Sequence, residues 1–102
     1  MNFCFYTGRV GKPPKYARSE SGVEYVSFSI EETSQEAYRG NYAILHFSCF
    51  SKKVLDYLKR VEFKQGNIVV VVARTDYFPE EVKGKTIYRM GLNATKVLVV
   101  KT

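Results

Sequence analysis

The chain has 102 residues, of which 16 are basic and 10 acidic, and its formal net charge is +6 at pH 7. This length fits one domain with one hydrophobic core, so we expect a single domain spanning residues 1–102. No apolar run reaches the roughly 18 residues of a transmembrane helix, and no signal-peptide pattern opens the chain. The sequence therefore predicts a cytoplasmic protein without membrane contact. Its charge favours polyanionic ligands, although charge alone does not identify one.

The N-terminal part predicts two strands joined by a connection rich in Gly, Pro, Ser and Lys. Residues 2–10 form the first strand, which is apolar on both faces, and residues 23–30 form the second. Adjacent prolines exclude a helix from the connection, residues 11–22. The buried face of the second strand is expected to consist of Val26, Phe28 and Ile30.

A polar segment and a third strand follow. Residues 31–41 predict a long exposed hairpin loop, because Gly40-Asn41 favours a turn. Residues 42–50 alternate as a strand with two different faces. The face that suits a barrel interior consists of Ala43, Leu45, Phe47 and Cys49. The opposite face mixes aromatic and polar groups and suits a binding surface: Tyr42, Ile44, His46, Ser48 and Phe50.

A short helix is predicted over residues 51–58, with Ser51 as its N-cap. Its buried stripe, at helical spacing, is Val54, Leu55, Leu58 and Val61. Lys52 and Lys53 occupy the first turn, where the helix dipole disfavours cations. This placement suggests that the two lysines serve a phosphate rather than the helix.

Two more strands complete the chain. Residues 67–75 hold a continuous β-branched run, which predicts burial on both faces, with one face in the core and the other covered by a second subunit. Residues 76–85 predict a second long hairpin loop, and residues 86–100 a last strand bent near Gly91. The chain is thus expected to be all-β with one short helix. Strand, strand, strand, helix, strand, strand is the order of the five-stranded OB-fold barrel.

The residues of the chain give little support for a catalytic site or a metal site. There is one histidine, and no Ser/His/Asp or Cys/His set is visible, so we expect no enzyme and no cofactor. His46 and Cys49 are three residues apart in a strand and therefore point to opposite faces, which argues against a metal site. Cys4 and Cys49 both fall in strands, and we expect two buried thiols without a disulfide.

A binding function has more support, because proteins that hold single strands combine a cationic groove with aromatic stacking platforms. The candidate stacking residues are Phe50, Phe78, Tyr42, Tyr38, Tyr77 and Tyr25. The candidate phosphate-binding residues are Arg9, Lys12, Lys15, Lys52, Lys53, Arg74, Lys83, Lys85 and Arg89, with His46 as a polar contact. Packing alternatives stay open: Phe50 beneath the helix, Phe78 as a staple of its loop, and Tyr25 in a cross-strand pair.

In order and spacing, three segments resemble the bacterial and phage single-stranded DNA-binding proteins with an OB fold. They are residues 8–14 (GRVGKPP), residues 22–30 (GVEYVSFSI) and residues 50–58 (FSKKVLDYL). By this resemblance Phe50 matches the stacking phenylalanine of the family. Ile44 falls where many members carry a stacking tryptophan, so that platform is lost or moved to Tyr42. Further contacts are implied at Phe78, Tyr38 and Lys52.

The resemblance implies binding of single-stranded DNA with little sequence preference, in replication, recombination or repair. It also implies a homo-oligomer, a dimer or tetramer joined in part through the first strand, and replication or recombination proteins as partners. The chain ends at Lys101-Thr102 without the acidic tail of housekeeping members. Either the tail has been trimmed from this chain, or the chain is a divergent, tailless member similar to phage or mobile-element versions or to the small primosomal relative, which is an OB-fold dimer. The alternatives are an accessory module of the primosome or of recombination that acts through protein contacts, and an RNA-binding OB protein.

Overall fold

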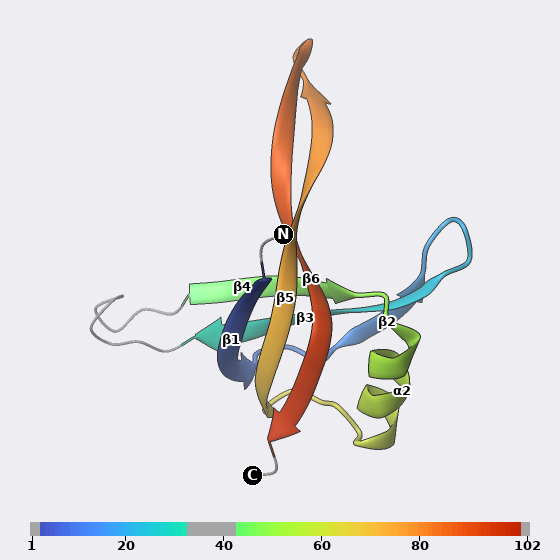
Figure 1. Cartoon of the computed structure of the whole chain (residues 1–102), viewed down its shortest axis with the longest axis vertical. Helices are drawn as coiled ribbons and strands as arrows, with labels where there is room; N and C mark the ends of the chain where they lie inside the picture. Colours follow the sequence, from blue (N-terminus) through green and yellow to red (C-terminus); the bar gives the residue numbers. More distant parts are fainter. Residues whose placement is uncertain (1–2, 33–42, 101–102) are drawn as a thin grey trace.

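The computed structural model describes residues 3–32 and 43–100 (Figure 1). The elements follow in the order β1 (Phe3–Val10), β2 (Lys15–Arg18), β3 (Glu24–Glu32), β4 (Ala43–Cys49), α2 (Lys52–Arg60), β5 (Ile68–Val82) and β6 (Lys85–Val100). Within the described ranges, no helix is long and apolar enough to cross a membrane.

Strand pairing closes the sheet into a barrel. β1 pairs with β5, β5 with β6, β6 with β4 and β4 with β3, and β3 pairs back to β1. These pairings are antiparallel except the one between β4 and β6, where Ser48 lies opposite Asn93. Closure satisfies the strand edges that an open sheet would leave unpaired. The predicted OB-fold barrel, with its helix between the third and fourth barrel strands, is confirmed.

The connection predicted at residues 11–22 contains an additional strand. β2 pairs antiparallel with β3, from Lys15 opposite Ser27 to Arg18 opposite Glu24. All four residues of β2 are exposed, so burial does not form this strand; hydrogen bonding to the edge of β3 does. The prediction of an irregular connection was wrong for this reason, because hydrophobic alternation cannot reveal an exposed edge strand.

The core lies inside the barrel and follows the predicted inward faces. Phe28 on β3 and Phe47 on β4 stack with their ring centroids 5.3 Å apart, and Phe63 meets Phe28 edge-on at 5.2 Å. Tyr6 of β1 packs edge-on against Phe47 at 5.4 Å. Such aromatic pairs add to the apolar area that each ring buries. The buried inward faces of β3, β4 and β5 are Val26, Phe28, Ile30, Phe47, Cys49, Val69, Val71 and Ala73.

The two cysteines differ in burial. Both are free, and Cys49 is buried, which raises the pKa of its thiol. Cys4 is only partly buried on β1, so the prediction of two buried thiols was wrong for Cys4. His46 is exposed on the other face of β4 from Cys49, as the alternation predicted.

Helix α2 closes one end of the barrel (Figure 1). Ser51 caps it, since its side chain accepts a hydrogen bond from the backbone N–H of Val54 at 3.5 Å. Leu55 and Leu58 are buried, as the helical stripe predicted. Val61 is 38% exposed, so its predicted burial was wrong. The helix ends at Arg60, and Val61 is the C-cap, where the helical period no longer sets the direction of the side chain.

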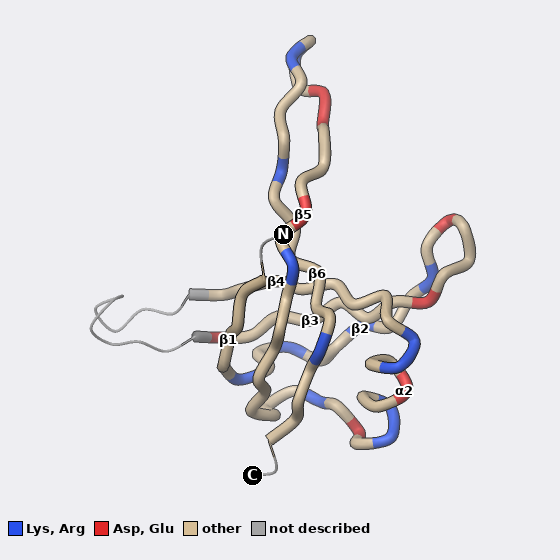
Figure 2. Tube along the Cα trace, in the orientation of Figure 1, with Lys and Arg blue, Asp and Glu red and all other residues tan. Residues whose placement is uncertain are grey.

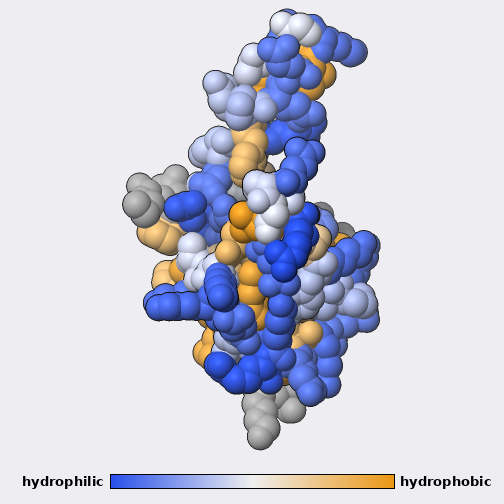
Figure 3. Space-filling model, turned by 90° about the vertical axis from the view of Figure 1, so that its right-hand side faces the viewer, coloured by the Kyte–Doolittle hydropathy of each residue, from blue (hydrophilic) through white to orange (hydrophobic). Residues whose placement is uncertain are grey.

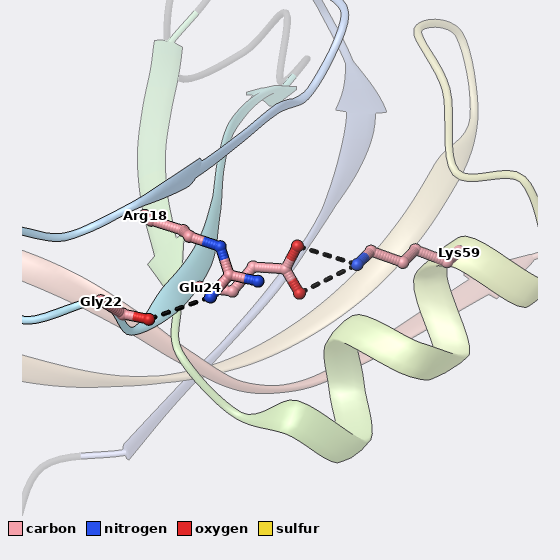
Figure 4. A network of polar contacts seen from close by, with 4 residues as sticks. All are labelled: Arg18, Gly22, Glu24 and Lys59. Atoms are coloured by element: carbon pink, nitrogen blue, oxygen red, sulfur yellow. Dashed lines mark hydrogen bonds and ion pairs between the residues drawn. The ribbon is translucent and has the colours of Figure 1, made fainter.

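An ion pair joins α2 to the β2–β3 hairpin (Figure 4). The ammonium of Lys59 donates to both carboxylate oxygens of Glu24 at 2.9 Å, while Arg18 donates to the carbonyl of Gly22 at 3.0 Å. The hydrogen bond from Lys59 holds the pKa of Glu24 below its usual value. Because both side chains are solvent-exposed, this pair orients the hairpin more than it stabilises the fold.

β5 and β6 continue beyond the barrel as a two-stranded ribbon, which projects at the top of Figure 1. Residues 76–85 were predicted as a loop, and this was wrong. Pairing extends to Val82 opposite Lys85, and a two-residue turn at Lys83 and Gly84 closes the hairpin. Their φ angles are 51° and 76°, and two positive values are what a type I′ turn requires. Pro79 interrupts the sequence pattern of a strand, but each strand of the ribbon has a free edge, where proline is tolerated.

Two glycines of the segment at residues 8–14 lie where β1 passes closest to β3. A Cβ on Gly8 would lie 2.6 Å from the backbone oxygen of Glu31. One on Gly11 would lie 2.9 Å from Oε1 of the same residue. A larger side chain at Gly8 would push β1 away from β3, where Arg9 and Val10 complete the barrel, whereas at Gly11 it would meet the side chain of Glu31. Gly8 therefore permits closure.

We predict that Gly8→Ala destabilises the protein by about 1–3 kcal/mol, the usual cost of overpacking. Alanine normally favours a strand over glycine, so a loss of stability reports the close contact with Glu31. Urea unfolding measures the change, and Thr7→Ala, an exposed neighbour on the same strand, is the control. Equal midpoints for Gly8→Ala and wild type would contradict the close-contact argument.

Candidate nucleic-acid interface

An open groove lies between β4 and the base of the ribbon, with a volume of about 500 Å³. Three predicted contact residues, His46, Phe50 and Phe78, line it together. The remaining lining is Ser27, Ile44, Leu45, Phe47, Ser48, Met90, Gly91, Leu92 and Asn93. The outward face of β4 and the start of the ribbon thus form one concave and mostly apolar surface.

Phe50 immediately follows β4 and is 46% exposed. Its ring stacks on Tyr25 of β3, with centroids 5.1 Å apart and planes inclined by 29°. This exposure argues against the alternative in which Phe50 packs beneath the helix. Tyr25 is partly buried and forms the cross-strand pair that the sequence left open, so the two rings make one aromatic platform.

Phe78 reaches the groove from the ribbon and is 53% exposed. Its ring lies across Gly91 on the facing strand, where an added Cβ would be 2.5 Å from the ring carbon Cε2. Gly91 therefore makes room for the ring. The sequence had predicted only that the strand bends near this glycine. Held in this way, Phe78 presents a large part of its surface to solvent at the rim of the groove.

A polar network fixes the base of the ribbon beside the groove. The amide of Asn93 donates to a carboxylate oxygen of Asp76 at 2.6 Å, and the Arg74 guanidinium lies 3.2 Å from the other oxygen. The hydrogen bond from Asn93, helped by Arg74, holds the pKa of Asp76 below its usual value. The charge of Arg74 is thus partly neutralised by Asp76, so Arg74 is a weaker candidate for a phosphate contact than an unpaired cation.

The other predicted cations are spread over the surface (Figure 2). Arg89 pairs with Glu80 on the ribbon, and Lys83 and Lys85 lie at its far end. Arg9 is exposed on β1. Both lysines in the first turn of α2 are exposed, and Lys53 lines a different groove, between the helix and the outer side of β5 and β6. The structure does not gather these side chains around the stacking groove.

Two lysines do approach it. Lys12 and Lys15 line a smaller cavity beside His46, next to the groove. Tyr77 is 61% exposed but lies outside the groove lining, because neighbouring residues of a strand point to opposite faces. The predictions for Tyr38 and Tyr42 fall outside the described residues.

The lining residues differ in how far the sequence could reveal them. Ile44 and Ser48 share the strand face of His46 and Phe50, which the period of two assigned to a binding surface, although neither was counted among the contact residues. Met90, Leu92 and Asn93 belong to β6 and reach the groove only because the barrel brings β6 beside β4. No local pattern reveals such a placement.

Comparisons with known proteins agree with this architecture. No protein-family model and no curated protein sequence matches the chain. Among solved structures, the mitochondrial single-stranded DNA-binding protein Rim1 of S. cerevisiae matches with a TM-score of 0.76 at 20% identity, over 98% of this chain and 95% of that one. The Plasmodium falciparum SSB, solved in complex with ssDNA, matches with a TM-score of 0.73 at 13% identity, over 99% and 96%. The chain has the OB fold of these proteins, which confirms the predicted resemblance in fold.

We predict that Gly91→Ala pushes the Phe78 ring off the strand and weakens oligothymidine binding, with a smaller effect than Phe78→Ala. A double-mutant cycle measures the coupling, with affinities taken from fluorescence anisotropy. In a Phe78→Ala background the alanine at position 91 should have no effect, because the ring that it would meet is gone. Additive losses in the cycle would show that Gly91 acts independently of the ring.

Proposed function

We propose that this chain is a single-stranded DNA-binding domain, spanning residues 1–102, that holds the strand with little sequence preference. Bases stack on Phe50 and Phe78, and lysine and arginine side chains contact the phosphates. The domain binds the strand and catalyses no reaction on it. This binding protects or organises single strands during replication, recombination or repair.

The observation that carries this proposal is the joint exposure of Phe50 and Phe78 in one groove, 46% and 53% respectively. A folded protein gains by burying such rings, so two half-exposed rings around a concave surface indicate a ligand with flat apolar faces. Nucleobases have such faces, and stacking on aromatic side chains accepts any base. The net charge of +6 supports a polyanionic strand. The Plasmodium structure supports the same ligand, since a protein of this fold was solved with ssDNA.

We also propose that the chain self-associates through the outer face of β1, β5 and β6. Phe5 is 75% exposed and lies opposite the partly buried Val72, and Leu98 is 58% exposed and lies opposite Val70. These side chains form an apolar face of the kind that marks an interface. In Figure 3, hydrophobic surface (orange) is visible on the barrel and on the projecting ribbon. A dimer or tetramer is the expected product.

The direct test is fluorescence anisotropy with a labelled single strand of about 35 nucleotides, at two salt concentrations. Tight binding that weakens steeply with salt is expected, because phosphate contacts release counterions. A duplex competitor should not displace the strand, and a matched RNA strand measures discrimination between the sugars. Affinity that is independent of salt, or equal displacement by duplex, would contradict the proposal.

Phe50→Ala and Phe78→Ala should each cost about 1–3 kcal/mol of binding free energy, the usual value of one stacked base. Because both rings are half exposed, thermal unfolding should change little. Tyr16→Ala is the control, since Tyr16 is 38% exposed and lies outside the groove. A Phe50→Ala protein that no longer folds would instead assign the ring to packing.

Leu98→Glu should reduce the mass of the assembly measured by light scattering, because it places a charge in the proposed interface. Ile87→Glu on the ribbon, where the isoleucine is 39% exposed, is the matched control and should leave the mass unchanged. An unchanged mass for Leu98→Glu would exclude this face as the interface.

A further inference from the structure

A second cavity of about 200 Å³ adjoins the stacking groove. It shares Ser27 and His46 with the groove, so the two spaces are contiguous. Its lining consists of Lys12, Pro13, Lys15, Ser27, Phe28, Ser29 and His46. Unlike the groove, whose exposed surface is mainly aromatic and aliphatic, this cavity brings together two ammonium groups, one imidazole and two hydroxyls.

Strand register places these groups on one wall. Lys15 of β2 lies opposite Ser27 of β3, and Ser29 of β3 lies opposite His46 of β4. Directly opposed residues share a face of an antiparallel sheet, so both serines and His46 point the same way. The connection after β1 covers this face from one side, where the N–H of Gly11 donates to the carbonyl of Ser29 at 3.2 Å. Ser29 is consequently only 6% exposed.

The cavity is positively charged and is not neutralised from within. No carboxylate belongs to its described lining, and neither lysine forms an ion pair within residues 3–32 and 43–100. On the same face of β3, the carboxylate of Glu31 lies against Gly11, and Glu31 is opposite Arg9 of β1. Across the groove, Asp76 is hydrogen-bonded to Asn93 and Arg74. The cations of the cavity are therefore available to an external anion.

We infer that Lys12, Lys15 and His46, with the hydroxyls of Ser27 and Ser29, form a pocket for one backbone phosphate of the strand whose bases occupy the groove. This inference rests on the proposed single-strand binding. His46 lies at the boundary of the two spaces, so its imidazole is placed to donate a hydrogen bond to the phosphate that adjoins the stacked bases.

The first test is the salt dependence of oligothymidine binding. For a single strand, each neutralised phosphate contributes about 0.7 to the slope of log affinity against log salt. The Lys12→Ala/Lys15→Ala protein should bind several-fold more weakly and lose about 0.7 from that slope. Arg60→Ala/Lys64→Ala is the control, because it removes the same charge from exposed positions outside both cavities.

The outcomes separate the inference from the function on which it rests. If wild type fails to bind any single strand, the proposed function is lost. If wild type binds and the Lys12/Lys15 double variant keeps the full slope, only the pocket is overturned. An equal loss of slope in the control would also overturn it, since the effect would then be one of net charge.

The second test is the His46→Ala variant, measured with oligothymidine at fixed pH and salt. This variant should bind several-fold more weakly, because it removes a hydrogen-bonding group from the boundary of the pocket and the groove. An unchanged affinity would overturn the role of His46, and thermal unfolding of each variant confirms that it is folded.

Discussion

The structure depends on the closure of the barrel by β1, which pairs with β5 along most of its length and turns at its end to pair with β3. This double pairing brings β1 within van der Waals distance of the backbone at Glu31. Only a residue without a Cβ satisfies that distance, which explains Gly8. Once β1 is in place, the connection that follows it is held over the face of β3 and β4.

The stacking groove is a consequence of how two strands leave this barrel. β5 and β6 outgrow the strands beside them and continue as a ribbon, so that an aromatic ring of the ribbon overhangs the outer face of β4. Gly91 leaves room for that ring on the neighbouring strand, and the contacts of Asp76 with Asn93 and Arg74 fix the base of the ribbon. An isolated two-stranded ribbon is only marginally stable in water, so its anchoring to the barrel positions Phe78.

Among the residues that the structure describes, only a few of the basic side chains behind the net charge of +6 lie beside the groove. Arg74 is paired with Asp76 of its own strand and Arg89 with Glu80 of the facing strand, and the lysines of the ribbon tip lie far along the hairpin from the groove. The lysines that adjoin the groove come from the connection between β1 and β2 and from β2 itself. Stacking and phosphate contact are therefore supplied by neighbouring parts of the barrel, joined at His46.

Local patterns determined a large part of this molecule from the sequence by itself. Alternation identified the inward faces of β3 and β4, Ser51 marked the start of the helix, and the order of elements indicated the OB fold. Exposure of His46 followed from the same alternation, whereas the exposure of Phe50 was left open until the structure placed its ring in the groove. These features are encoded within a few residues of each other, because strand and helix periods and capping are short-range effects.

Tertiary structure alone decided the rest. β2 forms by pairing with the edge of β3, and the two strands of the ribbon form by pairing with each other. Neither element shows a hydrophobic periodicity in the sequence that would have predicted it. The lining of the groove by Met90 and Asn93, and the hydrogen bond from Asn93 to Asp76, arise from contacts between β6 and distant segments. Such placements depend on pairing across long stretches of chain, where the identity of a partner is set by closure of the barrel and not by neighbours in sequence.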